Sequence, residues 1–120
     1  MIKSYKDLEV WKLSFAIAMD IFELTKRFPK EEVYSLSSQV VRSSRSISAN
    51  ITEGWAKRSY DGVFKHHLIH ALGSTAETIN WLDFAKACGY INESEHQFLA
   101  DKIDIIGKMI NKLHQNWITK

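Results

Sequence analysis

Three histidines within five residues, His66, His67 and His70, are the groups most able to do chemistry in this sequence. His66 and His70 are four residues apart, so on a helix both imidazoles lie on one face and can reach one metal ion. Glu77, two turns further on, could supply an oxygen. No third ligand stands at a neighbouring helical step, and the intervening glutamate of the zinc-protease motif is missing. We therefore expect no metal and no cofactor, and interpret the group as a partly exposed cluster that gains charge below about pH 6.5.

A second candidate is the carboxylate of Glu53, which follows Asn50 by one helical turn and precedes Gly54. Acid–base catalysis would require a partner acid, base or metal to tune this carboxylate, and none lies at a recognisable spacing. Glu77 could approach it only through the fold. We expect Asn50, Glu53 and Glu77 to belong to a buried or interfacial polar network with Arg42 and nearby serines. The sequence thus predicts no catalytic residue.

Basic residues form a third candidate site. The net charge of +2 is too small to indicate nucleic acid by itself, but residues 33–60 carry four basic residues and one acidic residue. Residues 55–60 are expected to form an exposed connector, where cations could contact phosphates and Trp55 and Tyr60 could stack on unpaired bases. The candidate nucleic-acid contacts are Arg42, Arg45, Lys57, Arg58 and Lys65.

Long helices must position these groups. Five glycines and one proline in 120 residues are too few for a many-turned β protein and favour uninterrupted helices. Apolar residues recur at spacings of three and four, which predicts helices over residues 7–28, 33–53 and 61–88 and a fourth beginning at Asn92. Four such helices joined by short loops predict an all-α, antiparallel up-down four-helix bundle that forms one domain over residues 1–120.

The predicted helix ends are marked by particular residues. Pro29 ends the first helix because it pushes the preceding residue out of the α region. Gly54 fits a position that ends the second helix in the left-handed conformation, and Gly89 closes the third helix. Asn92 caps the fourth, with Glu95 three residues later as the partner of a capping box.

Two of these helices carry a pattern that a single bundle does not require. The apolar arc of residues 7–28 spans roughly 200°, twice the width that packing on one side needs, so we expect a homo-oligomer. The helix over residues 33–53 contains seven serines, which are poor helix formers; close packing against a neighbouring backbone would favour it.

The cellular setting follows from the composition. Cys88 is the one cysteine, which excludes an internal disulfide and points to a reducing compartment. The longest apolar run is far below the roughly 20 residues of a membrane span, and the first residues form no signal core. We expect a soluble cytoplasmic protein with no membrane contact.

Several motifs of irregular spacing carry a resemblance to a known family. They are Tyr5-Lys-Asp-Leu8-Glu-Val-Trp11, Phe28-Pro29 with Glu32 and Tyr34, Gln39 before Arg42, Ser46-Ile-Ser-Ala-Asn50-Ile51-Thr-Glu53-Gly54, and Leu68-Ile-His-Ala71-Leu-Gly73-Ser74 with Glu77. Over nearly its whole length the chain resembles the bacterial four-helix-bundle family of 23S rRNA intervening-sequence proteins.

The resemblance implies a closed up-down bundle that assembles, in characterised relatives, into a homopentamer. In some bacteria such proteins are encoded inside inserted segments of 23S rRNA genes. The resemblance also implies kinship with accessory variability proteins of diversity-generating retroelements, which bind a reverse transcriptase and nucleic acid. Most of the family has no established molecular function. Relatives commonly carry apolar residues at the positions of His67 and His70, so no family metal site is implied.

Three functions of different classes follow. The first is a non-enzymatic, ring-like oligomer whose repeated basic segment binds structured RNA, such as rRNA or its intervening segment. The second is an adaptor whose wide apolar helix face docks another protein, such as a polymerase. The third, and least favoured, is a hydrolase or metal enzyme. Salt-dependent RNA binding separates the first from the second, and metal analysis addresses the third.

Overall fold

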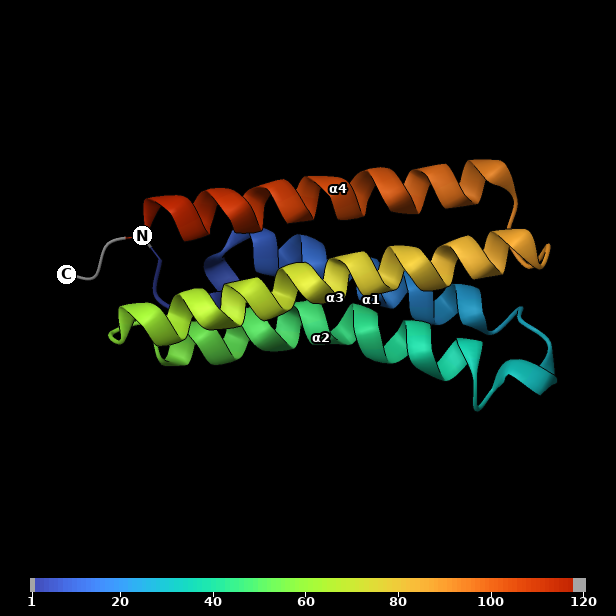
Figure 1. Cartoon of the computed structure of the whole chain (residues 1–120), viewed down its shortest axis with the longest axis horizontal. Helices are drawn as coiled ribbons and strands as arrows, with labels where there is room; N and C mark the ends of the chain where they lie inside the picture. Colours follow the sequence, from blue (N-terminus) through green and yellow to red (C-terminus); the bar gives the residue numbers. More distant parts are fainter. Residues whose placement is uncertain (1, 118–120) are drawn as a thin grey trace.

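Four long helices and two short 3-10 turns make up the fold, which we describe from a computed structural model covering residues 2–117. The elements in chain order are η1 (Tyr5–Asp7), α1 (Glu9–Thr25), η2 (Lys30–Glu32), α2 (Leu36–Ala56), α3 (Asp61–Ala87) and α4 (Glu93–Asn116). Successive helices run in opposite directions along the 48 Å axis of the molecule (Figure 1). The predicted all-α up-down four-helix bundle is therefore confirmed.

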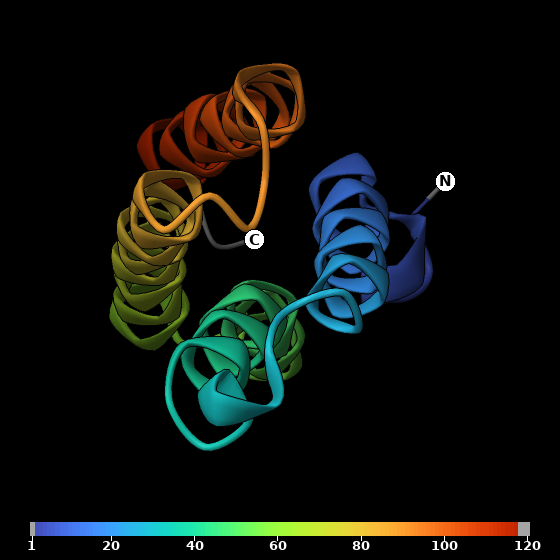
Figure 2. The same ribbon diagram turned by 90° about the vertical axis from the view of Figure 1, so that its right-hand side faces the viewer.

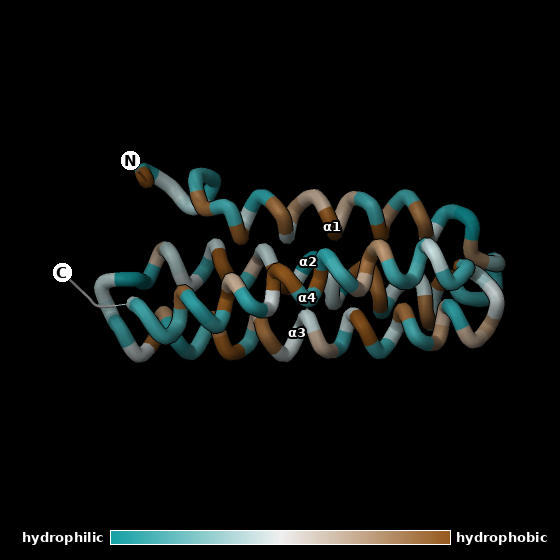
Figure 3. Tube along the Cα trace, turned by 90° about the horizontal axis from the view of Figure 1, so that it is seen from above, coloured by the Kyte–Doolittle hydropathy of each residue, from teal (hydrophilic) through white to brown (hydrophobic). Residues whose placement is uncertain are grey.

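The helices follow one another around the bundle in chain order. Seen along the axis, α1 and α3 stand at opposite corners, and each packs against α2 and α4 (Figure 2). Every helix carries both apolar and polar residues along its length (Figure 3). The buried residues of each helix recur mostly three or four apart, which gives it an inward stripe. Within residues 2–117, no helix is long and apolar enough to cross a membrane.

The core is made of aliphatic and aromatic side chains from all four helices. The largest fully buried apolar side chains are Ile17, Ile21, Val40, Ile47, Ile51, Phe64, Leu68, Leu82, Ile103, Ile106 and Ile110. Burial of each such side chain contributes about 1.5–3 kcal/mol before the entropy of ordering is subtracted. The residues that α4 buries, Leu99, Ile103, Ile106 and Ile110, are four, three and four residues apart, as the helical periodicity predicts.

Two of the predicted helix ends are confirmed. Asn92 Oδ1 accepts a hydrogen bond from the Glu95 backbone at 2.8 Å, and Glu95 Oε1 accepts one from the Asn92 backbone at 2.9 Å. Gly89 follows α3 with a φ of +79°, a conformation that L side chains rarely adopt. The capping box and the glycine each involve residues within three positions of the helix end, so both can be recognised from the sequence.

The ends near Pro29 differ from the prediction by a few residues. The prediction ran the first helix to residue 28, but α1 ends at Thr25 because the next three amides bond to carbonyls three residues back, in a 3-10 pattern. The second helix was expected from residue 33, but α2 begins at Leu36, after η2. The connection between α1 and α2 is therefore longer than predicted and consists of short 3-10 turns.

The predicted role of Gly54 is wrong. Gly54 lies inside α2 and is buried, and α2 continues to Ala56. A Cβ at Gly54 would lie 2.9 Å from His67 Cβ and 3.1 Å from Phe64 Cδ1, both on α3. Gly54 is therefore a point of close approach between α2 and α3, which the absence of a side chain permits, and not a helix terminator.

Hydroxyl groups line the seam between α2 and α3. Thr78 Oγ1 donates to Ser43 Oγ at 2.9 Å, and Ser74 Oγ donates to Ser46 Oγ at 3.0 Å. Ser43 and Ser44 are buried and donate to carbonyls of their own helix. Small hydroxyl side chains therefore satisfy one another or the preceding turn, and let the two helices pack closely.

An apolar surface remains along α1 and α4. Leu13 on α1 and Phe98 and Ile105 on α4 are exposed beside this seam. Phe15 and Met19 are also exposed, on other faces of α1. Between the two helices lie hollows of about 410 Å³ and 380 Å³. The apolar residues that line the first are Leu8, Val10, Met109 and Leu113, with Glu9, Lys112 and Asn116 beside them. Those that line the second are Leu24, Phe98 and Leu99, with Asp20, Ser94 and Glu95 beside them. The wide apolar arc expected of the first helix is only partly covered by its own bundle.

Candidate nucleic-acid interface

Charge is distributed unevenly along the bundle axis. Because the helices alternate in direction, the start of α1, the end of α2, the start of α3 and the end of α4 share one end of the molecule (Figure 1). We divide each helix at its middle and call this half, with η1 and the α2–α3 connection, the basic end. Within residues 2–117 it carries eight Lys and Arg against four Asp and Glu, and the opposite, acidic end carries seven against ten.

The basic end is built from segments far apart in sequence. Its cations are Lys3, Lys6, Lys12, Lys57, Arg58, Lys65, Lys108 and Lys112. Only three of these belong to the predicted contacts, because the sequence shows a local excess near residue 57 and does not show which other segments the fold brings to the same end. The directions of the four helices show that η1, the start of α1 and the end of α4 also lie at this end.

Lys57 and Arg58 directly follow α2 at this end of the molecule. The Arg58 guanidinium lies 4.4 Å from the centre of the Trp55 ring, and its Nη1 donates to the Trp55 carbonyl at 2.9 Å. Lys57 Nζ lies 3.6 Å from Glu53 Oε2, and Lys65 Nζ lies 3.9 Å from Asp61 Oδ2. Exposed pairs of this length contribute little, so both ammonium groups remain available to an anion.

The expected stacking role of Trp55 is wrong. Trp55 is inside α2 with 9% of its surface exposed, and its ring centre lies 5.8 Å from that of Trp117 and 6.3 Å from that of Phe64. The expected connector 55–60 therefore begins two residues later, and Trp55 closes the core beneath Arg58. Tyr60 is 69% exposed and is the aromatic side chain of this segment that solvent reaches.

Arg42 and Arg45 lie apart from the other predicted contacts. They belong to the acidic half of α2, and Arg42 is about 22 Å along the helix from Lys57. Arg42 Nη2 donates to Gln39 Oε1 at 3.1 Å, and the Arg45 guanidinium lies 5.3 Å from the centre of the Phe22 ring on α1. The structure thus separates Arg42 and Arg45, in the first half of α2, from Lys57 and Arg58, which follow its last turn.

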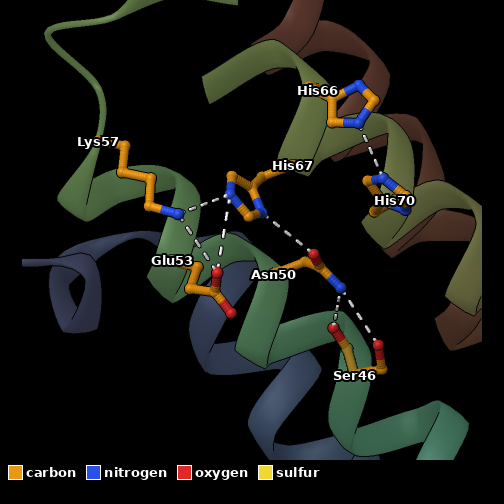
Figure 4. Close-up of polar contacts among 7 residues, drawn as sticks. All are labelled: Ser46, Asn50, Glu53, Lys57, His66, His67 and His70. Atoms are coloured by element: carbon orange, nitrogen blue, oxygen red, sulfur yellow. Dashed lines mark hydrogen bonds and ion pairs between the residues drawn. The ribbon is translucent and has the colours of Figure 1, made fainter. Parts of the chain in front are cut away.

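A polar cluster around His67 joins α2 to α3 (Figure 4). Asn50 Nδ2 donates to the carbonyl and hydroxyl oxygens of Ser46 at 3.0 and 3.1 Å, and Asn50 Oδ1 lies 3.2 Å from His67 Nδ1. His67 Nε2 lies 3.5 Å from Lys57 Nζ and 3.8 Å from Glu53 Oε2. A neutral imidazole with its proton on Nδ1 donates to Asn50 and accepts from Lys57, so it satisfies both neighbours.

This cluster differs from the predicted network in its members. Asn50 is half-buried in it, and Glu53 is at its edge with 61% of its side chain exposed. Glu77 lies elsewhere on α3, exposed, and accepts from Trp81 Nε1 at 3.0 Å. His67 takes the central place that was expected of the acidic residues. Its side chain is 15% exposed, whereas His66 and His70 are exposed, so the histidine cluster is partly exposed, as expected.

Gly54 is the residue in the sequence that could have indicated the position of His67, because it allows α3 to approach α2 at that point. Because Gly54 has no side chain, α3 comes close enough for the His67 ring to reach Asn50 and Glu53. Asn50 and His67 lie on different helices, so their contact cannot be recognised from spacing within one helix. It depends on how α2 and α3 cross. Within residues 2–117, no three His, Cys, Asp or Glu side chains gather where they could hold a metal ion.

Of the groups with a shifted pKa within residues 2–117, Asp7 lies at the basic end, and Glu32, Tyr90, Glu93 and Glu95 lie at the acidic end. Hydrogen bonds from Ser35 and Tyr90 lower the pKa of Glu32, and the same contact raises the pKa of Tyr90 to about 12. The bond from the Asn92 backbone and the ion pair with Arg27 lower the pKa of Glu95. These groups pin η2 and the α3–α4 connection to each other, which is a structural role.

The fold and these sites define an up-down four-helix bundle with a polarised charge distribution and a structural polar cluster. A family model for 23S rRNA-intervening sequence proteins matches residues 6–112. The chain belongs to that family, as its motifs indicated.

A solved structure supports the assignment. The chain is similar to a crystal structure from Bacteroides thetaiotaomicron, described as a protein with unknown function from the S23 ribosomal protein family. The two share 27% sequence identity with a TM-score of 0.81, over 89% of this chain and 99% of the other. A comparison with curated proteins finds no match. The kinship with retroelement accessory proteins stays a prediction.

Proposed function

We propose that this protein is a non-enzymatic oligomer that binds structured RNA through its basic end. The observation that carries the proposal is the concentration of eight cations at one end of the bundle, with only four acidic residues among them. Phosphate contacts by Lys and Arg supply most of the affinity for nucleic acid, and they require clustered charge more than net charge. The family description, which names an rRNA-intervening sequence, favours rRNA or its inserted segment as the ligand.

Assembly would strengthen this binding. The exposed apolar side chains of α1 and α4 and the hollows between them fit a second copy of the chain, and we propose a ring-like homo-oligomer, a pentamer as the family resemblance implies. A ring repeats the basic end in every subunit and brings those ends to one face. The exposed free Cys88 supports a reducing compartment, and we place this activity in the cytoplasm.

Removal of two cations tests the RNA site. We expect Lys57→Ala/Arg58→Ala to weaken binding to a structured rRNA fragment, measured by fluorescence anisotropy at several salt concentrations. Each lost phosphate contact should flatten the plot of log affinity against log salt by about 0.7–0.9. The loss should be similar for different RNA sequences, because phosphate contacts carry no sequence information.

The matched control is Arg42→Ala/Arg45→Ala, which removes the same charge from the acidic half of α2. We expect a smaller loss and a smaller change in slope for this pair. Equal effects of the two double variants would show that net charge alone governs binding and would contradict the basic end as the site. Circular dichroism and sedimentation confirm that each variant is folded and assembled.

A protein-binding adaptor is the second candidate function, and the α1–α4 surface favours it. Phe98 and Ile105 remain more than half exposed beside the hollows of this seam. A polymerase or another protein could occupy that surface where a second copy does not. Failure of the wild-type protein to bind any RNA at low salt would contradict the RNA proposal and leave the adaptor as the better interpretation.

A further inference from the structure

His66 and His70 form a pair outside the sites described above. Both lie on the exposed surface of α3, one helical turn apart, and their rings meet edge to face (Figure 4). The two Nε2 atoms are 3.0 Å apart, and the ring centres are 4.5 Å apart with an angle of 83° between the planes. His67 points away from this pair toward Asn50, so its ring is not available as a third member.

The separation of the two nitrogens matches a chelate. Metal–imidazole bonds are about 2.0–2.1 Å long, so two nitrogens 3.0 Å apart that bind one ion subtend an angle of about 90° at it. That angle belongs to square-planar and octahedral complexes. A tetrahedral ion would need the nitrogens about 3.4 Å apart for bonds of the same length.

The protons permit such a complex. In the metal-free pair, one Nε2 carries a hydrogen and donates it to the lone pair of the other, which requires at least one neutral ring. With the metal bound, both Nε2 lone pairs face the ion, and the donor ring carries its proton on Nδ1 after exchange through water. Because both rings are exposed, that N–H bonds to solvent, and water fills the remaining metal positions.

The geometry points to a two-histidine site at His66 and His70 for a divalent transition-metal ion of tetragonal or octahedral preference, Cu²⁺ or Ni²⁺. The missing third protein ligand, which counts against a closed zinc site, does not count against this one, because these ions accept two cis imidazoles and water. The helix places both side chains one turn apart before binding, and the rings turn so that both Nε2 lone pairs point at the ion. An ion that bridges residues 66 and 70 also fastens one turn of α3.

Copper titration tests the site on protein prepared without a histidine tag and treated with a chelator. We expect one Cu²⁺ per chain, an electron paramagnetic resonance spectrum with two equatorial imidazole nitrogens, and a rise in melting temperature on addition of Cu²⁺ or Ni²⁺. His66→Gln and His70→Gln should each lower the affinity for Cu²⁺ by about tenfold or more, since each removes one arm of the chelate.

The control is His114→Gln, which removes a histidine from α4 and should leave affinity and spectrum unchanged. Both target histidines are exposed, so circular dichroism should show all variants folded. Wild-type affinity in either His66→Gln or His70→Gln would overturn the proposal. So would a wild-type spectrum with a single nitrogen, or the absence of binding at micromolar Cu²⁺ and Ni²⁺.

Discussion

Gly54 determines how closely α2 and α3 approach each other. The atoms nearest to a Cβ at this position are His67 Cβ and a ring carbon of Phe64. His67 Cβ is fixed to the backbone of α3 and cannot move without the helix, and Phe64 is fully buried. The position therefore has no room even for a methyl group. The same closeness brings the His67 ring to Asn50.

Gly54→Ala should destabilise the protein although alanine is the better helix former. The gain in helix propensity is about 1 kcal/mol, and overpacking against His67 and Phe64 costs about 1–3 kcal/mol. Chemical denaturation measures the difference. The matched control is Gly73→Ala on α3, where no atom lies within 4 Å of the added methyl group, and which should stabilise by about 0.5–1 kcal/mol. Stabilisation by both substitutions would contradict the close crossing.

Among the elements, η2 and the α3–α4 connection depend on one contact whose strength changes with pH. Tyr90 donates from its hydroxyl to Glu32 Oε2 at 2.8 Å, and its ring packs against Phe28. The pKa of Glu32 is lowered, so its contribution is present above its ordinary pKa and is lost as the pH falls through the native value. The pKa of Tyr90 is raised to about 12, so its contribution is present below pH 10 and is lost as the pH rises toward 12.

Tyr90→Phe should therefore lower the melting temperature at pH 7 and have less effect at high pH. The phenolate of Tyr90 would face the Glu32 carboxylate in the wild type, whereas phenylalanine cannot ionise. Thermal denaturation of both proteins from pH 7 to pH 12 should show the two curves converge. Tyr60→Phe serves as the control, because Tyr60 is exposed. A difference between wild type and Tyr90→Phe that stays constant across this range would contradict the prediction.

The sequence predicted the helices well because each one is decided by its own periodicity. The buried residues of α4 and the capping box at Asn92 involve residues three or four apart, and such spacings can be recognised in the sequence alone. Gly54 was misinterpreted because a glycine near the end of a helical pattern has two physical uses, termination and close approach. Only the position of the facing helix decides between them.

The candidate sites were harder to predict for the same reason. Lys57 and Arg58 were found because they are adjacent in sequence. The contribution of η1 and of the end of α4 to the same surface depends on helix direction. Trp55 was expected in solvent because residues 55–60 were taken out of the helix together with Gly54. An error in one helix end thus moved an aromatic side chain from the core to the surface.

For the whole molecule, the exposed side chains of α1 and α4 predict an assembly. Sedimentation equilibrium at micromolar concentration should show a species several-fold heavier than the 13.9 kDa chain. Ile105→Glu on α4 should dissociate it, because a carboxylate would be buried in an apolar interface. Ile69→Glu on α3 is the control, since Ile69 is 52% exposed and Ile105 is 51% exposed.

Two results would contradict this interface. A wild-type protein that sediments as a monomer would exclude the assembly and, with it, the multiplication of the basic end. Dissociation by Ile69→Glu, with Ile105→Glu still assembled, would place the interface on α3. Far-ultraviolet circular dichroism of each variant separates dissociation from unfolding.

The opposite charges of the two ends make each chain an electric dipole along its longest dimension. In a cyclic assembly with the helices parallel to the symmetry axis, every dipole points the same way, so the particle has one cationic and one anionic face. A pairing of two chains in opposite directions would cancel the dipoles instead. A parallel ring is therefore directional: a polyanion would settle on one face alone, and the other face would stay open to a cationic partner.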